Sequence, residues 1–284
     1  MELYIFYHRV RIVMGMKVSF FNHKLLNEIS AKSAVLSTIV SFIMILEISQ
    51  TCRLSLFILV IFIVLLIYSF SLRAANNKKV LEEKINDTEI VVKYGDIFEQ
   101  QGIKVIAFNE FFDTLVDDKI ISKTTLNGIF IEQYSKGKEE LDQAIANENR
   151  LSVNLIRDNV ERKYGGKNKQ YKLGSICPVD EYFLLAFSHF DQDNKANLTV
   201  EDYISCLMHM WNELDRFYAG KSISIPLLGS GITRFNNIRI KPQELLEYML
   251  ITYKASMVNL KNIKVTFVLD KSLTDKIDLY NIRW

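Results

Sequence analysis

An uninterrupted apolar run dominates the first quarter of the chain. Residues 54–72, LSLFILVIFIVLLIYSFSL, contain no charged side chain. At about 1.5 Å per residue, a helix of this length spans roughly 29 Å, close to the thickness of the hydrocarbon core of a bilayer. A second apolar segment at about 33–50 carries several hydroxyl side chains and Glu47. We predict that both cross the membrane as a hairpin within residues 31–72, with a re-entrant or interfacial segment as the alternative for the first.

From residue 88 onward, β-branched apolar runs alternate with helical patterns. Strands are predicted at 88–94, 103–108, 182–188, 222–228 and 263–270, and helices at 141–150, 198–218 and 242–256. Strands separated by helices predict an α/β domain of three α/β/α layers with a mixed sheet, extending over 88–284. The polar residues 73–87 are predicted to continue the second membrane helix as a helical linker.

The density of charged residues also changes at the end of the apolar run, between residues 72 and 73. Residues 1–72 hold six basic and three acidic residues, whereas 73–284 hold 29 basic and 30 acidic residues. This balance lacks the basic bias of nucleic-acid-binding proteins, so no nucleic-acid partner is expected. Lys and Arg residues flank the outer ends of both predicted spans and only Arg53 lies between them, which predicts an inner-membrane protein with both termini and the α/β domain in the cytoplasm.

The first 30 residues form a separate segment in this prediction. They mix aromatic with basic side chains, which suits a cytoplasmic segment lying on the inner leaflet. Met14 and Met16 are alternative starts to Met1.

Two apparent motifs fail on inspection. Gly220-Lys221-Ser222 resembles the end of a P-loop, but Asp215 stands where its first glycine belongs. Residues 191–202, DQDNKANLTVED, resemble a calcium loop in which Lys195 and Ala196 occupy a ligand position and the required glycine position. The three cysteines and four histidines show no metal-ligand spacing, so no metal site is predicted.

Glycine turns after two predicted strands carry the remaining signal. In residues 225–233, IPLLGSGIT, the glycines can turn backbone N–H groups toward a phosphate, although an ordinary tight turn has the same pattern. Tyr94-Gly95-Asp96-Ile97 precedes the strand KVIAFN, which ends at Asn109. Taken singly, Asp96 is equally a turn aspartate and Asn109 a strand-end cap. As an ordered set over about 88–270, these residues resemble the macro domain, an ADP-ribose-binding module.

The resemblance implies a site for an ADP-ribose derivative. Asp96 would accept a hydrogen bond from the adenine amino group, Ile97 would lie near the adenine and Asn109 would face the distal ribose. Backbone groups of the later glycine turn would hold the diphosphate. The complete set of ligand-binding residues implied is Asp96, Ile97, Asn109, Asp113, Thr125, Leu126, Gly128, Leu228, Gly229, Ser230, Gly231, Ile232 and Thr233.

The segment after Asn109 indicates which kind of macro-domain protein this chain resembles. Residues 110–130, EFFDTLVDDKIISKTTLNGIF, hold one glycine where hydrolytic macro domains carry a run of glycines. Together with two N-terminal spans, this segment resembles the macro-domain membrane effectors of type II Thoeris anti-phage systems. That family implies a TIR-domain partner that consumes NAD and makes an ADP-ribose-type messenger, for which an amino-acid conjugate is one candidate. Messenger binding would drive homo-oligomerisation, and the membrane helices would then disrupt the lipid bilayer.

Two other functions compete with the effector hypothesis. A membrane-anchored ADP-ribosyl hydrolase would need an activated water near the distal ribose, with Asp113, Asp117 and Asp118 as the available carboxylates. A tether that reads ADP-ribosylated proteins would need only a shallow site. The missing glycine run argues against hydrolysis, so we predict a non-enzymatic protein without catalytic residues.

Overall fold

The computed structural model describes residues 16–45, 49–163, 165–236 and 238–283. They form two compact units. The helical unit contains the described residues up to Lys79 together with Ile277–Asn281, and the α/β unit contains Val80–Lys276 and residues 282–283. The first half of the predicted N-terminal segment, with Met1 and Met14, lies outside the described residues, and so does Glu47.

Two long helices build the helical unit. Helix α2 (His23–Met44) packs along α3 (Gln50–Asn76). Each begins at a polar cap: the Asn22 side chain accepts a hydrogen bond from the Leu25 N–H at 3.0 Å, and the Ser49 hydroxyl accepts one from the Cys52 N–H at 3.3 Å. These caps satisfy backbone donors that the first turn leaves without helical partners.

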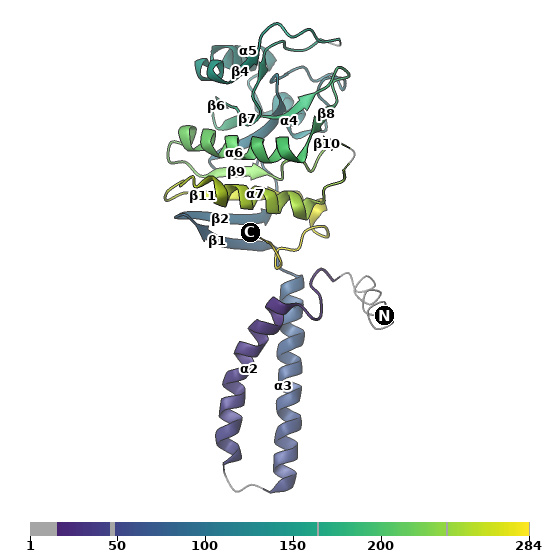
Figure 1. The fold of residues 1–284 in the computed structure, drawn as a ribbon, viewed down its shortest axis with the longest axis vertical. Helices are drawn as coiled ribbons and strands as arrows, with labels where there is room; N and C mark the ends of the chain where they lie inside the picture. Colours follow the sequence, from purple (N-terminus) through teal and green to yellow (C-terminus); the bar gives the residue numbers. More distant parts are fainter. Residues whose placement is uncertain (1–15, 46–48, 164, 237, 284) are drawn as a thin grey trace. The chain divides into compact units, whose positions relative to one another are not determined.

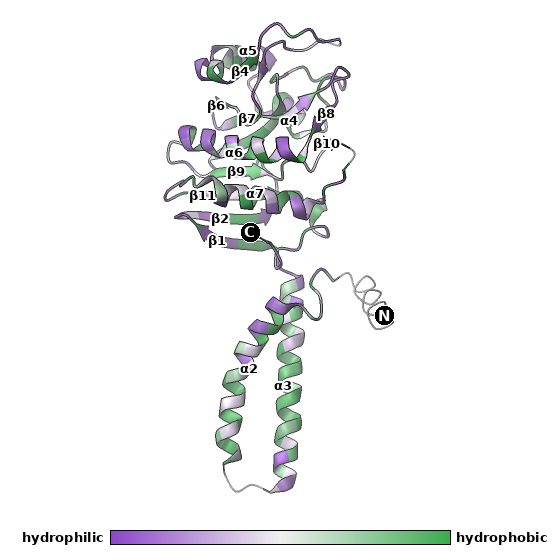
Figure 2. Ribbon diagram, viewed as in Figure 1, coloured by the Kyte–Doolittle hydropathy of each residue, from purple (hydrophilic) through white to green (hydrophobic). Residues whose placement is uncertain are grey.

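The two helices differ in polarity. Among the described residues, α3 alone is long and apolar enough to cross a membrane, and Figure 2 shows mostly hydrophobic residues along its middle. The hydroxyls of Thr38 and Ser41 in α2 bond to the carbonyls of Ala34 and Ser37, at 3.0 and 2.9 Å. The structure therefore provides one candidate span; the second predicted span falls largely on α2 and stays a prediction.

The predicted helical linker 73–87 is wrong beyond Asn76. Strand β1 (Val80–Ile85) pairs antiparallel with β2 (Thr88–Tyr94), a few residues after α3 ends. Asn86 and Asp87 connect the strands with φ angles of 48° and 65°. A two-residue hairpin turn of this hand suits the twist of its strands, and Asn and Asp adopt positive φ more readily than most residues.

A mixed sheet forms the centre of the α/β unit (Figure 1). Its order is β1-β2-β11-β9-β3-β7-β8-β10, with β6 also paired to β7, and the run from β2 to β7 is parallel. The remaining members are β3 (Ile103–Asn109), β6 (Ile176–Val179), β7 (Tyr182–Phe190), β8 (Ala196–Leu198), β9 (Ile223–Pro226), β10 (Arg234–Phe235) and β11 (Lys264–Leu269). Strands β4 (Leu155–Arg157) and β5 (Gln170–Tyr171) form a separate pair.

Helices cover both faces of this sheet. Figure 1 shows α6 (Val200–Phe217) and α7 (Pro242–Ser256) on one face. The Trp211 ring of α6 lies 6.2 Å from the Phe267 ring of β11. The next residue of β11, Val268, packs instead in a buried cluster with Phe130 and Leu141, which come from helical segments other than α6 and α7. Because successive strand residues point to opposite faces, this alternation confirms three layers.

The second face is covered by short elements. They are α4 (Leu126–Ile129), the π-helix η1 (Phe130–Tyr134), α5 (Lys138–Asn147) and, further on, the 3₁₀ turns η2 (Asn149–Asn154) and η3 (Lys271–Leu273). Phe130, Leu141 and Ile145 join Val268 in the buried cluster. Helix α6 on the first face begins with a capping box, since the Thr199 hydroxyl accepts from the Asp202 N–H at 2.9 Å and Asp202 accepts from the Thr199 N–H at 3.1 Å.

Candidate functional site

A pocket of about 480 Å³ opens at the carboxyl ends of the parallel strands β2, β9 and β11. Ligands of open α/β sheets bind preferentially at this edge. The pocket is lined by Gly95, Asp96, Ile97, Phe98, Leu126, Ile129, Gln133, Tyr134, Pro226, Leu227, Ser230, Val268, Asp270 and Lys271. The sequence therefore brings four segments together here: the turn after β2, the α4–η1 element, the turn after β9 and the end of β11.

Asp96 is held in a defined orientation at the pocket. One carboxylate oxygen accepts a hydrogen bond from the Phe98 N–H at 2.9 Å, and the Asp96 carbonyl accepts one from the Gln100 side chain at 2.6 Å. The Asp96 side chain remains exposed, whereas the neighbouring Ile97 is buried in the core cluster with Val268. The turn thus presents the oriented Asp96 carboxylate as a hydrogen-bond acceptor next to the apolar Ile97 and Val268, which line the same pocket.

Two aromatic rings form another wall. Phe98 and Tyr134 are stacked with ring centroids 4.1 Å apart and planes inclined by 4°. Tyr134 ends the π-helix η1, whose first residues Phe130 and Ile131 are buried. Single π-helical turns are rare and occur frequently at functional sites. Sequence analysis missed this pair, because neither ring belongs to a local motif.

The glycine turn after β9 is only partly constrained to glycine. Gly229 has a φ of 81°, and a Cβ there would lie 3.0 Å from the Phe235 ring. Gly231 has open space around its Cα, and Ile232 beside it is exposed. The Ser230 hydroxyl donates to the Leu227 carbonyl at 2.7 Å and lines the pocket. Gly229 therefore sets the shape of the turn, while Gly231 and Ile232 beyond it are exposed residues.

Charged side chains complete the pocket at the end of β11. Asp270 accepts a hydrogen bond from the Ser272 N–H at 2.8 Å and caps η3. Hydrogen bonds from the side chain and backbone of Ser272 lower the pKa of Asp270 below its ordinary value. Lys271 supplies a cation at the same rim. The pocket thus offers both a negative and a positive group to a polar ligand.

Asn109 and Asp113 are occupied in a buried network. The Asn109 amide donates to Asp113 at 2.9 Å, and its oxygen accepts from the Phe111 N–H at 3.0 Å. The Asp113 carboxylate, which is 1% exposed, forms an ion pair with Arg162 at 2.6 Å. The Lys167 N–H also donates to it at 2.7 Å. This network fixes the loop around Arg162 to the end of β3, and neither predicted residue lines the pocket.

The α4 residues divide between lining and support. Leu126 lines the pocket, whereas Thr125 caps α4 by accepting from the Gly128 N–H at 3.3 Å. A Cβ on Gly128 would lie 2.2 Å from the Ser122 carbonyl oxygen, so glycine is required there for packing.

The predicted site residues thus fall into two groups. Those that line the pocket are Asp96, Ile97, Leu126 and Ser230. Those that do not are Asn109, Asp113, Thr125, Gly128, Leu228, Gly229, Gly231, Ile232 and Thr233.

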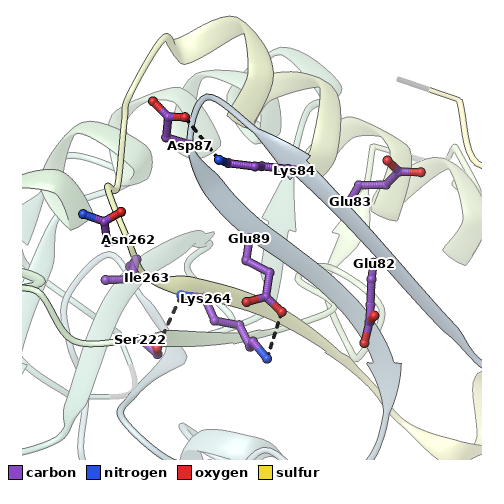
Figure 3. A pocket seen from close by; sticks show the side chains of 9 residues that line it. All are labelled: Glu82, Glu83, Lys84, Asp87, Glu89, Ser222, Asn262, Ile263 and Lys264. Carbon is purple, nitrogen blue, oxygen red and sulfur yellow. Dashed lines mark hydrogen bonds and ion pairs between the residues drawn. The ribbon is translucent and has the colours of Figure 1, made fainter.

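A second hollow lies beside the β1–β2 hairpin (Figure 3). Its polar side chains include Glu82, Glu83 and two pairs: Lys84 with Asp87 at 3.4 Å, and Lys264 with Glu89 at 2.9 Å. The excess of carboxylates disfavours an anionic ligand. Within the described ranges, no group of three His, Cys, Asp or Glu side chains is arranged to hold a metal. The pocket at the strand ends is therefore the candidate site.

A family model and a curated relative that match this chain both name the same protein family. The family model described as "Thoeris protein ThsA, Macro domain" matches residues 90–270. Thoeris protein ThsA of Bacillus amyloliquefaciens (strain Y2) is 39% identical over 255 residues, which cover 87% of this chain and 84% of that protein.

Solved structures with low sequence identity are also similar. The Oceanobacillus iheyensis macrodomain with ADP is 15% identical with a TM-score of 0.46, covering 71% of this chain and 92% of that one. The same macrodomain with MES bound is 16% identical with a TM-score of 0.44, covering 67% and 88%.

Proposed function

Because this chain belongs to the Thoeris ThsA family and carries its macro domain, we propose that it is a membrane-bound effector of anti-phage defence that binds an ADP-ribose-type messenger. The observation that carries the proposal is the pocket at the ends of β2, β9 and β11, which combines an oriented carboxylate, a stacked aromatic pair and a serine-containing glycine turn.

Each part of the pocket suits one part of such a messenger. The Phe98–Tyr134 pair offers a flat surface for a nucleobase, and Asp96 beside it accepts from a base amino group. The Lys271 ammonium at the pocket rim suits a diphosphate, and Ser230 of the glycine turn lines the same pocket. The volume of about 480 Å³ lies within the usual range for small-molecule pockets, roughly 300–1,000 Å³.

Binding rather than hydrolysis is supported by the carboxylates near β3. Asp113 is paired with Arg162, and Asp117 accepts from the Lys119 and Ile120 N–H groups at 2.9 and 2.7 Å. Asp118 accepts from the Lys123 N–H at 3.0 Å. Since a general base must reach the proton that it removes, carboxylates held in turns outside the pocket are poorly placed to activate water. We assign Asn109 and Asp113 to support of the site.

The membrane step follows from the helical unit. Helix α3 is the candidate span, and α2 packed beside it would form a hairpin in the inner membrane with the α/β unit in the cytoplasm. One or two helices cannot enclose a pore, so disruption of the bilayer would require several copies. We propose that messenger from a TIR-domain partner promotes this homo-oligomerisation, as far as its affinity differs between the two states.

Calorimetry of the full chain in nanodiscs with ADP-ribose tests the binding step. Replacing Asp96 by Asn keeps an oxygen for the Phe98 N–H but turns the other oxygen into a donor, so binding should weaken by about 1–3 kcal/mol. Asp215→Asn, on the exposed side of α6, is the matched control and should bind normally. Equal affinity of Asp96→Asn and the unmodified protein would contradict the proposed site.

Dye leakage from cells expressing the full chain tests the effector step. Leakage should appear only when the product of the TIR-domain partner is present. If cells stay sealed while ADP-ribose conjugates are hydrolysed, the protein is an enzyme instead.

A further inference from the structure

The end of the chain is part of the helical unit. Residues Ile277–Asn281, here named the C-terminal clasp, group with α2 and α3, although the segment before them belongs to the α/β unit. Ile277, Leu279 and Tyr280 of the clasp are all buried. The burial of these three side chains indicates that the segment is packed specifically.

Contacts of the clasp reach both helices. The Asn22 amide, at the start of α2, donates to Asn281 at 2.7 Å. The Lys24 ammonium donates to the Tyr280 carbonyl at 3.2 Å and lies 4.9 Å from the centre of its ring. Tyr280 also belongs to a buried cluster with Val18, Leu25 and Ile29 from the N-terminal side and Leu72 and Ala75 from the last turns of α3. The clasp thus connects the start of one helix to the end of the other.

Asp278 gives the clasp its shape. One of its oxygens accepts from the Tyr280 and Asn281 N–H groups at 3.0 and 3.3 Å. The other accepts from the Asn281 side chain at 2.6 Å. Because one carboxylate folds the segment, Tyr280 and Asn281 are presented to the helices together.

The clasp is linked to the pocket by a short, structured stretch. Val268, Asp270 and Lys271 line the pocket, and Asp270 caps η3. Hydrogen bonds continue from there: the Thr274 N–H donates to the Lys271 carbonyl at 3.2 Å and the Lys276 N–H to the Leu273 carbonyl at 2.9 Å. Hydrogen-bonded turns therefore occupy the five residues that separate Lys271 from Ile277 in sequence. A ligand that shifts Asp270 or Lys271 would therefore act on the clasp.

We propose that the C-terminal clasp is a ligand-sensitive lock on the α2–α3 pair. In the ligand-free protein it holds the start of α2 against the end of α3. Ligand contact at Asp270 and Lys271 favours its release, which lets the two helices pair with a second copy of the chain. The inference rests on the proposed function, because it names the regulation of the same pocket.

Reciprocity makes the lock measurable. If ligand binding favours release, then weakening the clasp must strengthen ligand binding by the same factor. Tyr280→Ala removes the buried ring. Asn281→Ala removes the hydrogen bond from Asn22 and the one to Asp278, with little change in apolar burial. Asp275→Ala is the matched control, since Asp275 is exposed in the same stretch and outside the clasp.

The experiment uses the full chain in nanodiscs, with ADP-ribose as the probe. Cys52 at the start of α3 is exposed, whereas Cys177 and Cys206 are buried, so a fluorophore pair can be attached selectively at Cys52. In the unmodified protein, ADP-ribose should raise energy transfer between copies. In both clasp variants, transfer should be high without ligand, and ADP-ribose should bind about 5- to 150-fold more tightly. Continued protection of Cys177 and Cys206 from thiol reagents shows that the α/β unit is still folded.

The outcomes separate the two proposals. If the unmodified protein binds ADP-ribose but both clasp variants match it in affinity and energy transfer, the lock is wrong and the proposed function stands. If the unmodified protein does not bind ADP-ribose, the proposed function fails, and the ligand-free energy transfer of the variants still reports whether the clasp restrains pairing.

Discussion

Glu110 is a buried carboxylate directly after β3, and it has hydrogen-bond partners from two other segments. It is 2% exposed and lies 2.7 Å from His189 Nδ1. The side chain of Gln170 donates to it at 2.8 Å and the N–H of Phe190 at 3.2 Å. Burying a charge is costly unless such partners are present. These contacts hold the end of β3 to β7 and to β5.

Stability should depend on pH through this ion pair. The hydrogen bond to Glu110 raises the pKa of His189 above its ordinary value, against the opposing effect of burial. A raised folded-state pKa stabilises the protein fully below the unfolded value of about 6.5, and this contribution is lost as pH rises through the folded value. We therefore expect the melting temperature of the full chain to fall as the pH rises above about 6.5.

The variant His189→Gln tests how much the His189–Glu110 ion pair contributes to the pH dependence of stability. The variant should lose that part of the pH dependence when melting is followed by circular dichroism, while His23→Gln, exposed at the start of α2, should keep it. An unchanged pH profile in His189→Gln would rule out the ion pair as its source.

Asp96 and Gly229 were predicted from the ordered set of turn motifs, and their conformations depend on neighbours in sequence. Asp96 accepts from the Phe98 N–H, and Gly229 needs its positive φ. Asp113 was predicted as a ligand contact but pairs with Arg162, a residue 49 positions away. Such a pair is set by the tertiary fold, which leaves no periodic signal. The same reason hid the stacking of Phe98 on Tyr134.

At the level of elements, prediction succeeded where periodicity was long. The predicted ranges of β2 and α7 agree with the structure, and those of α6 and β11 differ at their ends. Prediction failed at β1, because its charged residues directly follow a long helix and were assigned to that helix. Asn86 and Asp87 mark a hairpin turn that the prediction overlooked. The π-helix was also missed, because one wider turn leaves no distinct sequence pattern.

Element α4 provides a test of packing near the pocket. Gly128→Ala would place a methyl group against the Ser122 carbonyl, so we expect a loss of about 1–3 kcal/mol in the free energy of unfolding. Gly231→Ala, with open space at its Cα and no positive φ, should change stability far less. Urea denaturation of both variants measures the difference, and equal stabilities would refute the packing role of Gly128.

At the scale of the whole molecule, the proposed activity depends on insertion of α3. Leu59 and Leu66 lie within this helix and are exposed. Replacing both by Arg should oppose insertion by about 2.5–3.5 kcal/mol for each charge near the centre of the bilayer. We expect the double variant to leave the membrane fraction and to lose toxicity.

A matched pair of changes in the same helix provides the control. Leu59→Ile and Leu66→Ile preserve apolar character and should leave both membrane recovery and toxicity intact. If the Arg variant remained membrane-bound and toxic, α3 would not be the membrane anchor.

The position of Tyr280 also has a consequence for biosynthesis. The N-terminal helices leave the ribosome first, yet the cluster that contains Val18, Leu25 and Leu72 includes a residue close to the end of the chain. This cluster cannot be completed until translation of the intervening α/β unit has finished. A nascent chain paused or truncated before Tyr280 would therefore have α2 and α3 without the clasp contacts that connect the start of one helix to the end of the other. Synthesis of the clasp, after the whole α/β unit, is thus a condition for this part of the resting arrangement of the helices.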